Sequence, residues 1–600
     1  MSDDVFQEEK MNKRLLCLLL SFVMLVSVML TGCSSNENEL QNIAEAAARN
    51  TMTLSMYLMS EKEVSEDQVE KIENAVNQIT KARFKVQLDL RYFTEDEYYE
   101  AVEAAFKKTK EDKDAKAAAE KAEKEALKNE GKTVAKTSEE VTEEATIINE
   151  YGIPELAYPT IKDSQVDIFY LGGYDKFSEY SGKSWLSALD DPLSSDAQII
   201  TDYVSDIYLT YLKELSMGAT YMIPSNAPAG EYTYMLVNKD ILAKYDYATT
   251  EGFSSLVCDN VKDILANVSL YDKDYLPLYS STGEIDALNV SYFGTDANGT
   301  ITYDFSVLGG TVDPTWGYME NSHYYDYHNI FANVSFKNQI TALTEYRING
   351  YYGTEADANK PFAVGYVKGS AELKELYSDD YEVIVLDTPK ISTEELYANG
   401  FAVSTYATDV SRCMDIITYL STNVDFRNLL LYGIEGENYE IIEEELDGVI
   451  YKMVNRLNEN YVMDVNKTGN VTIAYPMVGE LPNIREYQKL QNRDTTPKLD
   501  LGFALDVVME PINKEAMAEL AELSLELKEK MLACKSIEEL DAFFTEASAL
   551  VANNDSYKIM SDTEYNKYSP NYNAEANGEG CGFAYIYKTW LDNNKLWPTE

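Results

Sequence analysis

The apolar and polar positions between residues 51 and 106 predict two strands that alternate with two helices. The apolar run 51–58 predicts a strand, and residues 84–93 alternate as a second strand does. Residues 66–80 carry apolar side chains at helical spacing, at Val69, Ile72, Val76 and Ile79. Thr94, followed by three acidic residues, is typical of a capped helix start. This β-α-β-α order predicts the opening of a parallel α/β sheet.

The same pattern resumes after residue 150. A strand at 166–171 ends in Gly172-Gly173 and is followed by a short helix at 174–180. Further strands are predicted at 217–225, 232–238, 381–386 and 401–404. Strong amphipathic spacing predicts one long helix at 409–431, and residues 510–552 are predicted to be mostly helical. Residues 296–299, Asp-Ala-Asn-Gly between apolar runs, predict a hairpin turn.

A charged segment interrupts the alternation. Residues 107–147 are rich in Lys, Glu and Ala and have few large apolar side chains. Such a composition predicts an exposed helix or a disordered insert, and the sequence does not decide between them. No ligand-binding role is expected there.

The N-terminus has the pattern of an export signal. Basic residues after Met11 precede an apolar run from Leu15 to Leu30, which is shorter than the roughly 20 residues that a membrane-spanning helix needs. Leu30-Thr31-Gly32-Cys33 then follows the bacterial lipobox pattern. We therefore expect cleavage before Cys33 and a lipid on its thiol. Residues 1–10 are acidic where a signal peptide is basic, so Met11 is expected to be the true start.

Composition narrows the possible partners. The 600 residues include 102 Asp and Glu against 51 Lys and Arg, for a formal net charge of −51. Such a chain should repel nucleic acid and anionic lipid. The length suits two or three cores rather than one. Cys258, Cys413, Cys534 and Cys581 show no CxxC spacing, so isolated thiols are expected more than a disulfide framework.

Sequence signatures of enzymes are scarce. His323 and His328 are the only histidines, and the sequence contains no HExxH, GxSxG or GxxxxGK[ST] motif. The sequence therefore predicts no metal, no cofactor and no catalytic residues. A pair of carboxylates for glycoside hydrolysis needs no motif, so a glycan-active surface enzyme stays open as an alternative.

Several stretches resemble bacterial extracellular solute-binding lipoproteins of ABC importers, of the family 1 type that binds sugars. They are Val166–Gly173, Trp185–Asp191, Ala219–Asn226, Tyr234–Asp240 and, most specifically, Phe426–Tyr439 with its Tyr-Gly-Ile-Glu-Gly sequence. The resemblance covers roughly 51–106 and 150–550. The 107–147 insert and the C-terminal end depart from it.

The resemblance implies an α/β fold with two lobes of the type II periplasmic-binding-protein kind and a ligand cleft between them. It implies these segments: a signal peptide at 1–33, a tether at 34–50, the first part of lobe 1 at 51–237, the first part of lobe 2 at 238–395, and a C-terminal part at 396–600 that adds helices to both lobes. The chain would be a monomer on the outer face of the membrane of a single-membrane bacterium, and permease subunits would be its partners.

Candidate ligand residues follow from the rule that ligands of α/β sheets bind beyond the carboxyl ends of strands. Trp316 lies in a loop rich in Gly and Pro, and its ring suits stacking on a sugar. The other candidates, from loops after predicted strands, are Tyr57, Gly173, Tyr174, Asn226, Tyr232 and Tyr366.

The predicted ligand is a carbohydrate or oligosaccharide, since tyrosine is abundant, at 47 residues, and aromatic rings suit the apolar faces of sugars. A peptide or another polar solute is the alternative within the class of binding proteins. A sensor subunit that feeds a membrane receptor is a further alternative.

Overall fold

The computed structural model describes residues 50–129, 146–148, 154–215, 219–281, 294–295, 301–302, 308–310, 327–352, 360–497 and 511–561. The predicted lipidation site Cys33 and the predicted sugar-stacking residue Trp316 lie outside these residues, as does the predicted turn at 296–299. No helix in the described part of the chain is both long enough and apolar enough to cross a membrane.

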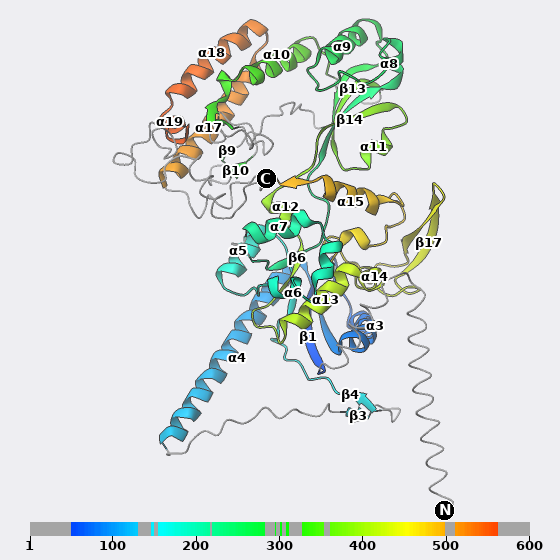
Figure 1. Cartoon of the computed structure of the whole chain (residues 1–600), viewed down its shortest axis with the longest axis vertical. Helices are drawn as coiled ribbons and strands as arrows, with labels where there is room; N and C mark the ends of the chain where they lie inside the picture. Colours follow the sequence, from blue (N-terminus) through cyan, green and yellow to red (C-terminus); the bar gives the residue numbers. More distant parts are fainter. Residues whose placement is uncertain are drawn as a thin grey trace, which may run out of the picture. The chain divides into compact units, whose positions relative to one another are not determined.

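The predicted α/β fold class is confirmed, and the first of two main sheets is mixed rather than purely parallel (Figure 1). Its strands lie in the order β2-β1-β5-β16-β6. Their bounds are Val86–Thr94, Met52–Ser60, Ile168–Leu171, Gly400–Val403 and Met222–Pro224. β1 and β5 are parallel, as the β-α-β-α pattern predicts, but β16 runs antiparallel to both β5 and β6. A strand from late in the chain thus lies between two strands from its first half.

Helices accompany this sheet in chain order. They are α3 (Glu66–Phe84), α4 (Glu95–Asn129), α5 (Tyr174–Gly182), α6 (Asp190–Leu193) and α7 (Asp206–Leu215). α4 continues into the predicted insert as far as Asn129, so the first part of the insert is an exposed helix (Figure 1). A short 3-10 helix, Gln198–Asp202, lies between α6 and α7.

The long helix predicted at 409–431 is wrong in one respect, because two helices occupy that range. α13 (Val410–Thr422) ends at Asn423, whose backbone is extended, and α14 (Val424–Tyr432) begins directly after it. The Asn423 side chain accepts a hydrogen bond of 2.9 Å from Phe426 N and caps the second helix. Apolar spacing continues across the break, which is why periodicity alone misses it.

The second sheet has the order β14-β7-β13-β8. Its strands are Tyr381–Asp387, Tyr232–Asn238, Phe362–Gly369 and Leu276–Ser280. α8 (Lys239–Lys244), α9 (Asp259–Tyr271) and α10 (Val334–Ile348) contribute side chains to its core, including Ile241, Ile264 and Tyr346. β7 pairs antiparallel with both β13 and β14. Short helices α11 (Leu373–Leu376) and α12 (Thr393–Leu396) flank β14 in the sequence.

The C-terminal helices are α17 (Pro511–Ala533), α18 (Ile537–Asn553) and α19 (Asp555–Ser561), which confirms the predicted helical segment. α18 packs on α10 and on the 3-10 helix Ile330–Ala332, where Phe331, Phe336 and Phe544 meet edge to face or tilted. α15 (Ile484–Asp494) follows a further 3-10 turn, Val471–Ile473.

Small strand pairs complete the described residues. They are β3–β4 (Thr146–Ile148 and Pro154–Leu156), β9–β10 (Gly294–Thr295 and Ile301–Thr302), β11–β12 (Leu308–Gly310 and Tyr327–Asn329), β15–β19 (Lys390–Ile391 and Thr496–Pro497) and the β17–β18 hairpin (Tyr439–Leu446 and Val449–Arg456). β9 and β10 are antiparallel.

By internal contacts the chain divides into two compact units, and most of both sheets belongs to the larger one. The smaller unit includes Asn77–Leu88 and residues near Thr160. Within it, the Asn77 side chain donates to Leu88 O (2.8 Å) and accepts from Leu88 N (2.7 Å). The predicted lobe boundaries at 237 and 395 stay a prediction.

Candidate functional site

The carboxyl end of β5 carries a fixed turn, Gly172-Gly173. The Tyr99 hydroxyl donates to Gly172 O (2.9 Å) and accepts from Gly172 N (3.1 Å), and Gly173 N donates to Tyr397 O (2.8 Å). Gly173 has a φ of +91° and no atom within 4 Å of where a Cβ would stand. The turn therefore has a rigid backbone and open space beside Gly173.

Tyr174 begins α5 directly after this turn and is only partly buried. Its ring centroid lies 5.5 Å from that of Tyr397 and 6.4 Å from that of Phe177, both of which are buried. An aromatic ring braced by two others loses little conformational freedom when a ligand stacks on it. Tyr174 is thus suited to contact an apolar ligand face.

A charged group lies at the same end of the first sheet. Lys467 Nζ is 3.2 Å from Glu95 Oε2 and 3.8 Å from Glu61 Oε1. Glu61 follows β1 and Glu95 starts α4, and β1 is parallel to β5, so their carboxyl ends share one edge of the sheet. Tyr99, one turn after Glu95, reaches the Gly172 turn. We call Glu61, Glu95, Gly173, Tyr174 and Lys467 the carboxyl-end patch.

The patch is partly open to solvent. The Lys467 side chain is 17% exposed and that of Glu95 is 76% exposed. Burial raises the pKa of the nearby Tyr170 hydroxyl, with Tyr99, Asp464 and Glu95 adding to the effect. Tyr170 therefore stays neutral and donates to Asn399 Oδ1 at 2.7 Å. Carboxylate acceptors, an ammonium donor and an aromatic ring can together bind a polyhydroxylated solute.

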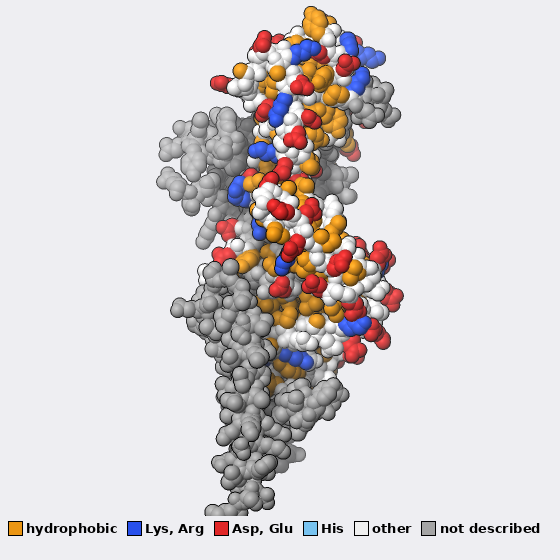
Figure 2. All heavy atoms as spheres, turned by 90° about the vertical axis from the view of Figure 1, so that its right-hand side faces the viewer, with side chains coloured by type: hydrophobic (Ala, Val, Ile, Leu, Met, Phe, Trp, Pro, Cys, Tyr) orange, Lys and Arg blue, Asp and Glu red, His pale blue; other side chains and the backbone are white. Residues whose placement is uncertain are grey.

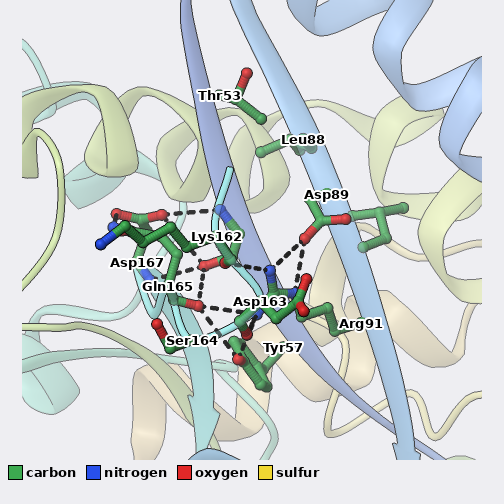
Figure 3. A network of polar contacts seen from close by, with 12 residues as sticks. Thr53, Tyr57, Leu88, Asp89, Arg91, Lys162, Asp163, Ser164, Gln165 and Asp167 are labelled. Carbon is green, nitrogen blue, oxygen red and sulfur yellow. Dashed lines mark hydrogen bonds and ion pairs between the residues drawn. The ribbon is translucent and has the colours of Figure 1, made fainter. Parts of the chain in front are cut away.

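Tyr57, a predicted ligand residue, lies in the core of the first sheet. Its hydroxyl donates to Gln165 O (3.2 Å) and accepts from Arg91 Nη1 (2.6 Å) (Figure 3). Its ring stacks on that of Phe93. Burial raises the pKa of this hydroxyl, and the Arg91 charge opposes the rise. Gln165 precedes β5, so the Tyr57 hydroxyl points toward the amino end of that strand, away from Gly172.

Arg91 and Asp167 anchor this amino end. Arg91 donates to Asp89 Oδ2 (2.7 Å) and to the carbonyls of Lys162 and Gln165 (3.0 Å each) (Figure 3). Asp167 is fully buried, and its oxygens accept from Ser55 N (2.9 Å) and Thr408 N (2.7 Å) among others. These contacts hold the strands rather than a ligand.

Asn226, also predicted to bind ligand, lies in the connection between the sheets, whereas Tyr232, another predicted ligand residue, begins β7 and is buried in a hydrophobic cluster of the second sheet. Asn226 is buried with a φ of +55°, and its amide donates to Tyr203 O, Asn470 Oδ1 and Thr472 Oγ1 at 3.0–3.2 Å. The Tyr232 hydroxyl donates to Asp494 Oδ2 (2.9 Å). Tyr366 is 1% exposed, in the core of the second sheet.

The chain passes between the two main sheets twice in the described residues, through residues 225–231 and through 388–399, and a third segment, α15 with β19, lies beside these two passages. Two of these segments pair directly, because β15 and β19 form a parallel ribbon. The first lies against the second, since a Cβ on Gly230 would stand 2.6 Å from Lys390 O. Gln491 of α15 donates to Gly230 O (2.8 Å) and accepts from Ala371 N (3.1 Å). The three segments therefore lie side by side.

Side-by-side connections of this kind restrict the motion between the regions they join. Hinges are a few loop or element-terminal residues that absorb changes in φ and ψ. Here such residues include Gly230, with a φ of +63°, and the two-residue strands β15 and β19. The arrangement suits a hinge between two α/β regions.

The most specific sequence motif has a structural explanation. Gly433 has a φ of +86°, and a Cβ there would overlap Asn438 Oδ1. Asn438 Oδ1 accepts from Ile434 N (2.8 Å) and from Gln68 Nε2 of α3 (3.2 Å). The Tyr-Gly-Ile-Glu-Gly stretch thus ties the end of α14 to α3.

The described ranges show how the metal-binding residue types and three of the cysteines are arranged. No group of three or more His, Cys, Asp or Glu side chains is placed to hold a metal ion there. Cys258, Cys413 and Cys534 are free, and burial raises the pKa of the Cys413 thiol well above its usual value.

Figure 2 shows Asp and Glu side chains spread over one face among hydrophobic ones.

Of the predicted ligand residues, Gly173 and Tyr174 lie at the carboxyl end of β5. Tyr57, Tyr232 and Tyr366 lie in cores and Asn226 lies in the connection, while Trp316 is outside the described residues. A ligand-binding role stays a prediction for each of them. Sequence reasoning missed Glu95 and Lys467 as a pair. The two residues are 372 positions apart in the sequence. The only local signal near either of them is the run of acidic residues at 95–97, which predicts a helix start.

No family model and no curated protein matches the chain. Solved structures are similar to it at low identity. An N-glycan transport solute-binding protein from Streptococcus pneumoniae is 15% identical, over 90% of this chain and 100% of that one, with a TM-score of 0.49. An extracellular solute-binding protein from Bifidobacterium longum subsp. infantis is 12% identical over 91% and 99%, with a TM-score of 0.42.

A third similar structure is the ABC substrate-binding protein Lmo0181 from Listeria monocytogenes, in complex with cycloalternan. It is 11% identical, over 84% of this chain and 100% of that one, with a TM-score of 0.30. All three are named as solute- or substrate-binding proteins, the class that the sequence motifs resemble. At these TM-scores the function of this chain rests on its own residues.

Proposed function

We propose that this chain is an extracellular solute-binding lipoprotein that captures a carbohydrate or oligosaccharide and delivers it to the permease of an ABC importer. The observation that carries the proposal is the double passage of the chain between two α/β regions, with α15 and β19 packed beside it. Three segments side by side, with Gly230 against Lys390 and β15 paired with β19, form a hinge around which two regions can close on a ligand.

The carboxyl-end patch supports a polyhydroxylated ligand. Tyr174 offers an aromatic face, and Glu95 and Lys467 offer an acceptor and a donor for hydroxyl groups. An acidic chain disfavours strongly anionic ligands. A neutral sugar meets these conditions better than a nucleotide or a phosphorylated solute does.

The cellular setting is part of the proposal and rests on the sequence. The lipobox at Leu30–Cys33 supports a lipid on Cys33, which would hold the protein as a monomer at the outer face of the membrane. Tethering raises the effective concentration of the loaded protein near its permease. Binding, not catalysis, is the proposed activity.

A thermal-shift screen of the chain from residue 34 onward tests the proposal. A ligand that binds only the folded state raises the melting temperature. We expect a rise with one class of neutral glycan and none with short peptides. Glycan turnover would show an enzyme instead, and a rise with peptides alone would move the assignment to peptide binding.

Variants of the carboxyl-end patch test whether the glycan binds at that patch. Lys467→Met should reduce the glycan-induced shift, because it removes the cation between Glu61 and Glu95. The matched control is Lys71→Met, which also removes a lysine held by two carboxylates, Asp67 and Glu437. An equal loss in both variants would show that Lys467 acts only through stability.

A further inference from the structure

Helix α15 has two sides that contact different parts of the molecule. We call the first sheet with the elements packed on it the first region, and the second sheet with its elements the second region. An α-helix takes about 3.6 residues per turn, so residues seven apart lie on one side. One side of α15 consists of Arg485 and Asn492. The opposite side consists of Tyr487, Leu490, Gln491 and Asp494.

Arg485 attaches α15 to the first region. Its Nε donates to Ala474 O (3.0 Å), and the residue is 8% exposed. Ala474 caps a 3-10 turn whose Val471 N donates to Ser225 O (2.8 Å), directly after β6. The guanidinium therefore binds backbone that belongs to the first region.

Asn492 makes a second attachment on the same side of the helix. Its Nδ2 donates to Asn226 O (2.9 Å), and its Oδ1 accepts from the Tyr208 hydroxyl of α7 (3.3 Å). Asn492 is 3% exposed. Separating a buried amide from its partners is unfavourable, because no water is there to replace them. This side of α15 is therefore held firmly by the first region.

The opposite side of α15 lies on the second region through apolar contacts. Tyr487 and Leu490 pack against a hydrophobic cluster of the second sheet that includes Tyr232 and Tyr234. Apolar contacts have no preferred direction, and packed helices slide over one another by small distances in shear motions. This surface can therefore shift without losing all of its contacts.

Hydrogen bonds give these apolar contacts one preferred position. The Tyr232 hydroxyl donates to Asp494 Oδ2 (2.9 Å), and Ala371 N donates to Gln491 Oε1 (3.1 Å). The Asp494 side chain is 32% exposed, so water can replace the tyrosine hydroxyl when this contact opens. We call Tyr232 and Asp494 the latch pair.

We propose that α15 is a brace that moves with the first region and slides on the second region, and that the latch pair stabilises one of two arrangements of the regions. The inference rests on the proposed function, since the motion is the one that closes the regions on a glycan. Rotation at Gly230 and at the β15–β19 ribbon would move the second region past α15. Opening the latch pair shifts the populations of the two arrangements and so changes the apparent affinity for ligand.

Energy transfer between two fluorophores tests the proposal in the ligand-free chain from residue 34 onward. Non-natural amino acids carry the fluorophores. One replaces Lys489, an exposed residue of α15, and the other replaces either Asp191 in the first region or Tyr271 in the second, both exposed. The Tyr232→Phe, Asp494→Ala variant removes the latch pair. We expect it to shift or split the transfer-efficiency distribution between positions 489 and 271 and to leave that between 489 and 191 unchanged.

The matched control is the Tyr451→Phe, Glu486→Ala variant. It removes another hydrogen bond between a tyrosine and a carboxylate of α15 (3.2 Å), but one that leads to β18 instead of the second sheet. Both distributions should stay as they are in the unchanged chain. Melting temperatures show whether each variant is folded, and Asp494→Ala alone opens the latch pair if the double variant does not fold.

Three results would overturn the proposal: unchanged distributions without the latch pair, a change between positions 489 and 191, or an equal change in the control. Saturating glycan added to the unchanged chain should shift only the distribution between positions 489 and 271. No shift with any glycan would count against the proposed function, whereas the ligand-free distributions decide the role of α15 by themselves.

Discussion

Tyr174 is the predicted ligand residue whose surroundings best suit ligand contact. We expect Tyr174→Ala to raise the dissociation constant for the bound glycan by about tenfold, because the variant loses a braced stacking surface. Tyr174→Phe keeps the ring and should bind nearly as well as the unchanged chain. Titration calorimetry measures both, and equal affinity in all three proteins would contradict a stacking role.

Asp167 has a structural role at the opposite edge of the sheet. Asp167→Asn should lower the free energy of unfolding by about 2–3 kcal/mol, because the amide NH2 replaces one of the two acceptor oxygens and so opposes either the Ser55 N–H or the Thr408 N–H. Denaturant unfolding measures the change. The exposed Asp191→Asn is the control and should be neutral. A neutral Asp167→Asn would show that the buried contacts contribute nothing to stability.

At the scale of elements, the connection between the sheets depends on a close backbone approach at Gly230. Gly230→Ala should destabilise the protein more than Gly436→Ala by about 1–3 kcal/mol. Both glycines have positive φ, but only at Gly230 would a Cβ meet a backbone, at 2.6 Å from Lys390 O. Thermal melts compare the two variants, and equal losses would show that the crossing segments are not tightly packed.

How far the sequence predicts the structure also differs among elements. Local periodicity predicts β1, β7 and α3, whose apolar positions are set by neighbours in the sequence. It does not predict that β16 lies between β5 and β6, because that pairing is decided by contacts across more than 170 residues, such as Phe401 with Ile223. Local periodicity also misses the end of α13 at Asn423 and the ion pair between Lys467 and Glu95. The spacing of apolar residues contains no information on either the backbone conformation at Asn423 or the distance between Lys467 and Glu95.

At the scale of the whole molecule, buried tyrosines make alkaline pH destabilising. Burial raises the pKa of Tyr98 and Tyr461 well above the usual value, and that of Tyr439 to about 12. The unfolded chain loses these protons near about pH 10. The unfolded state then binds fewer protons than the folded state, so stability is complete below about pH 10 and falls as pH rises toward 12.

Arg427 has the opposite effect on the pH dependence of stability, because burial lowers its pKa to about 9 and the folded state then loses this proton before the unfolded state does. It is a single group against several tyrosines. Melting temperatures measured on both sides of about pH 10, together with tyrosinate absorbance, check the prediction. We expect absorbance and unfolding to rise together. Full tyrosine ionisation near about pH 10 in a folded protein would contradict the buried positions.

The proposed function requires that the chain binds a carbohydrate between two hinged α/β regions. Titration calorimetry of the chain from residue 34 onward against a panel of neutral oligosaccharides and short peptides tests it most directly. We expect saturable heat with one glycan class, weakened by Tyr174→Ala and by Lys467→Met but not by Lys71→Met. Saturable heat with peptides and none with any glycan would contradict it.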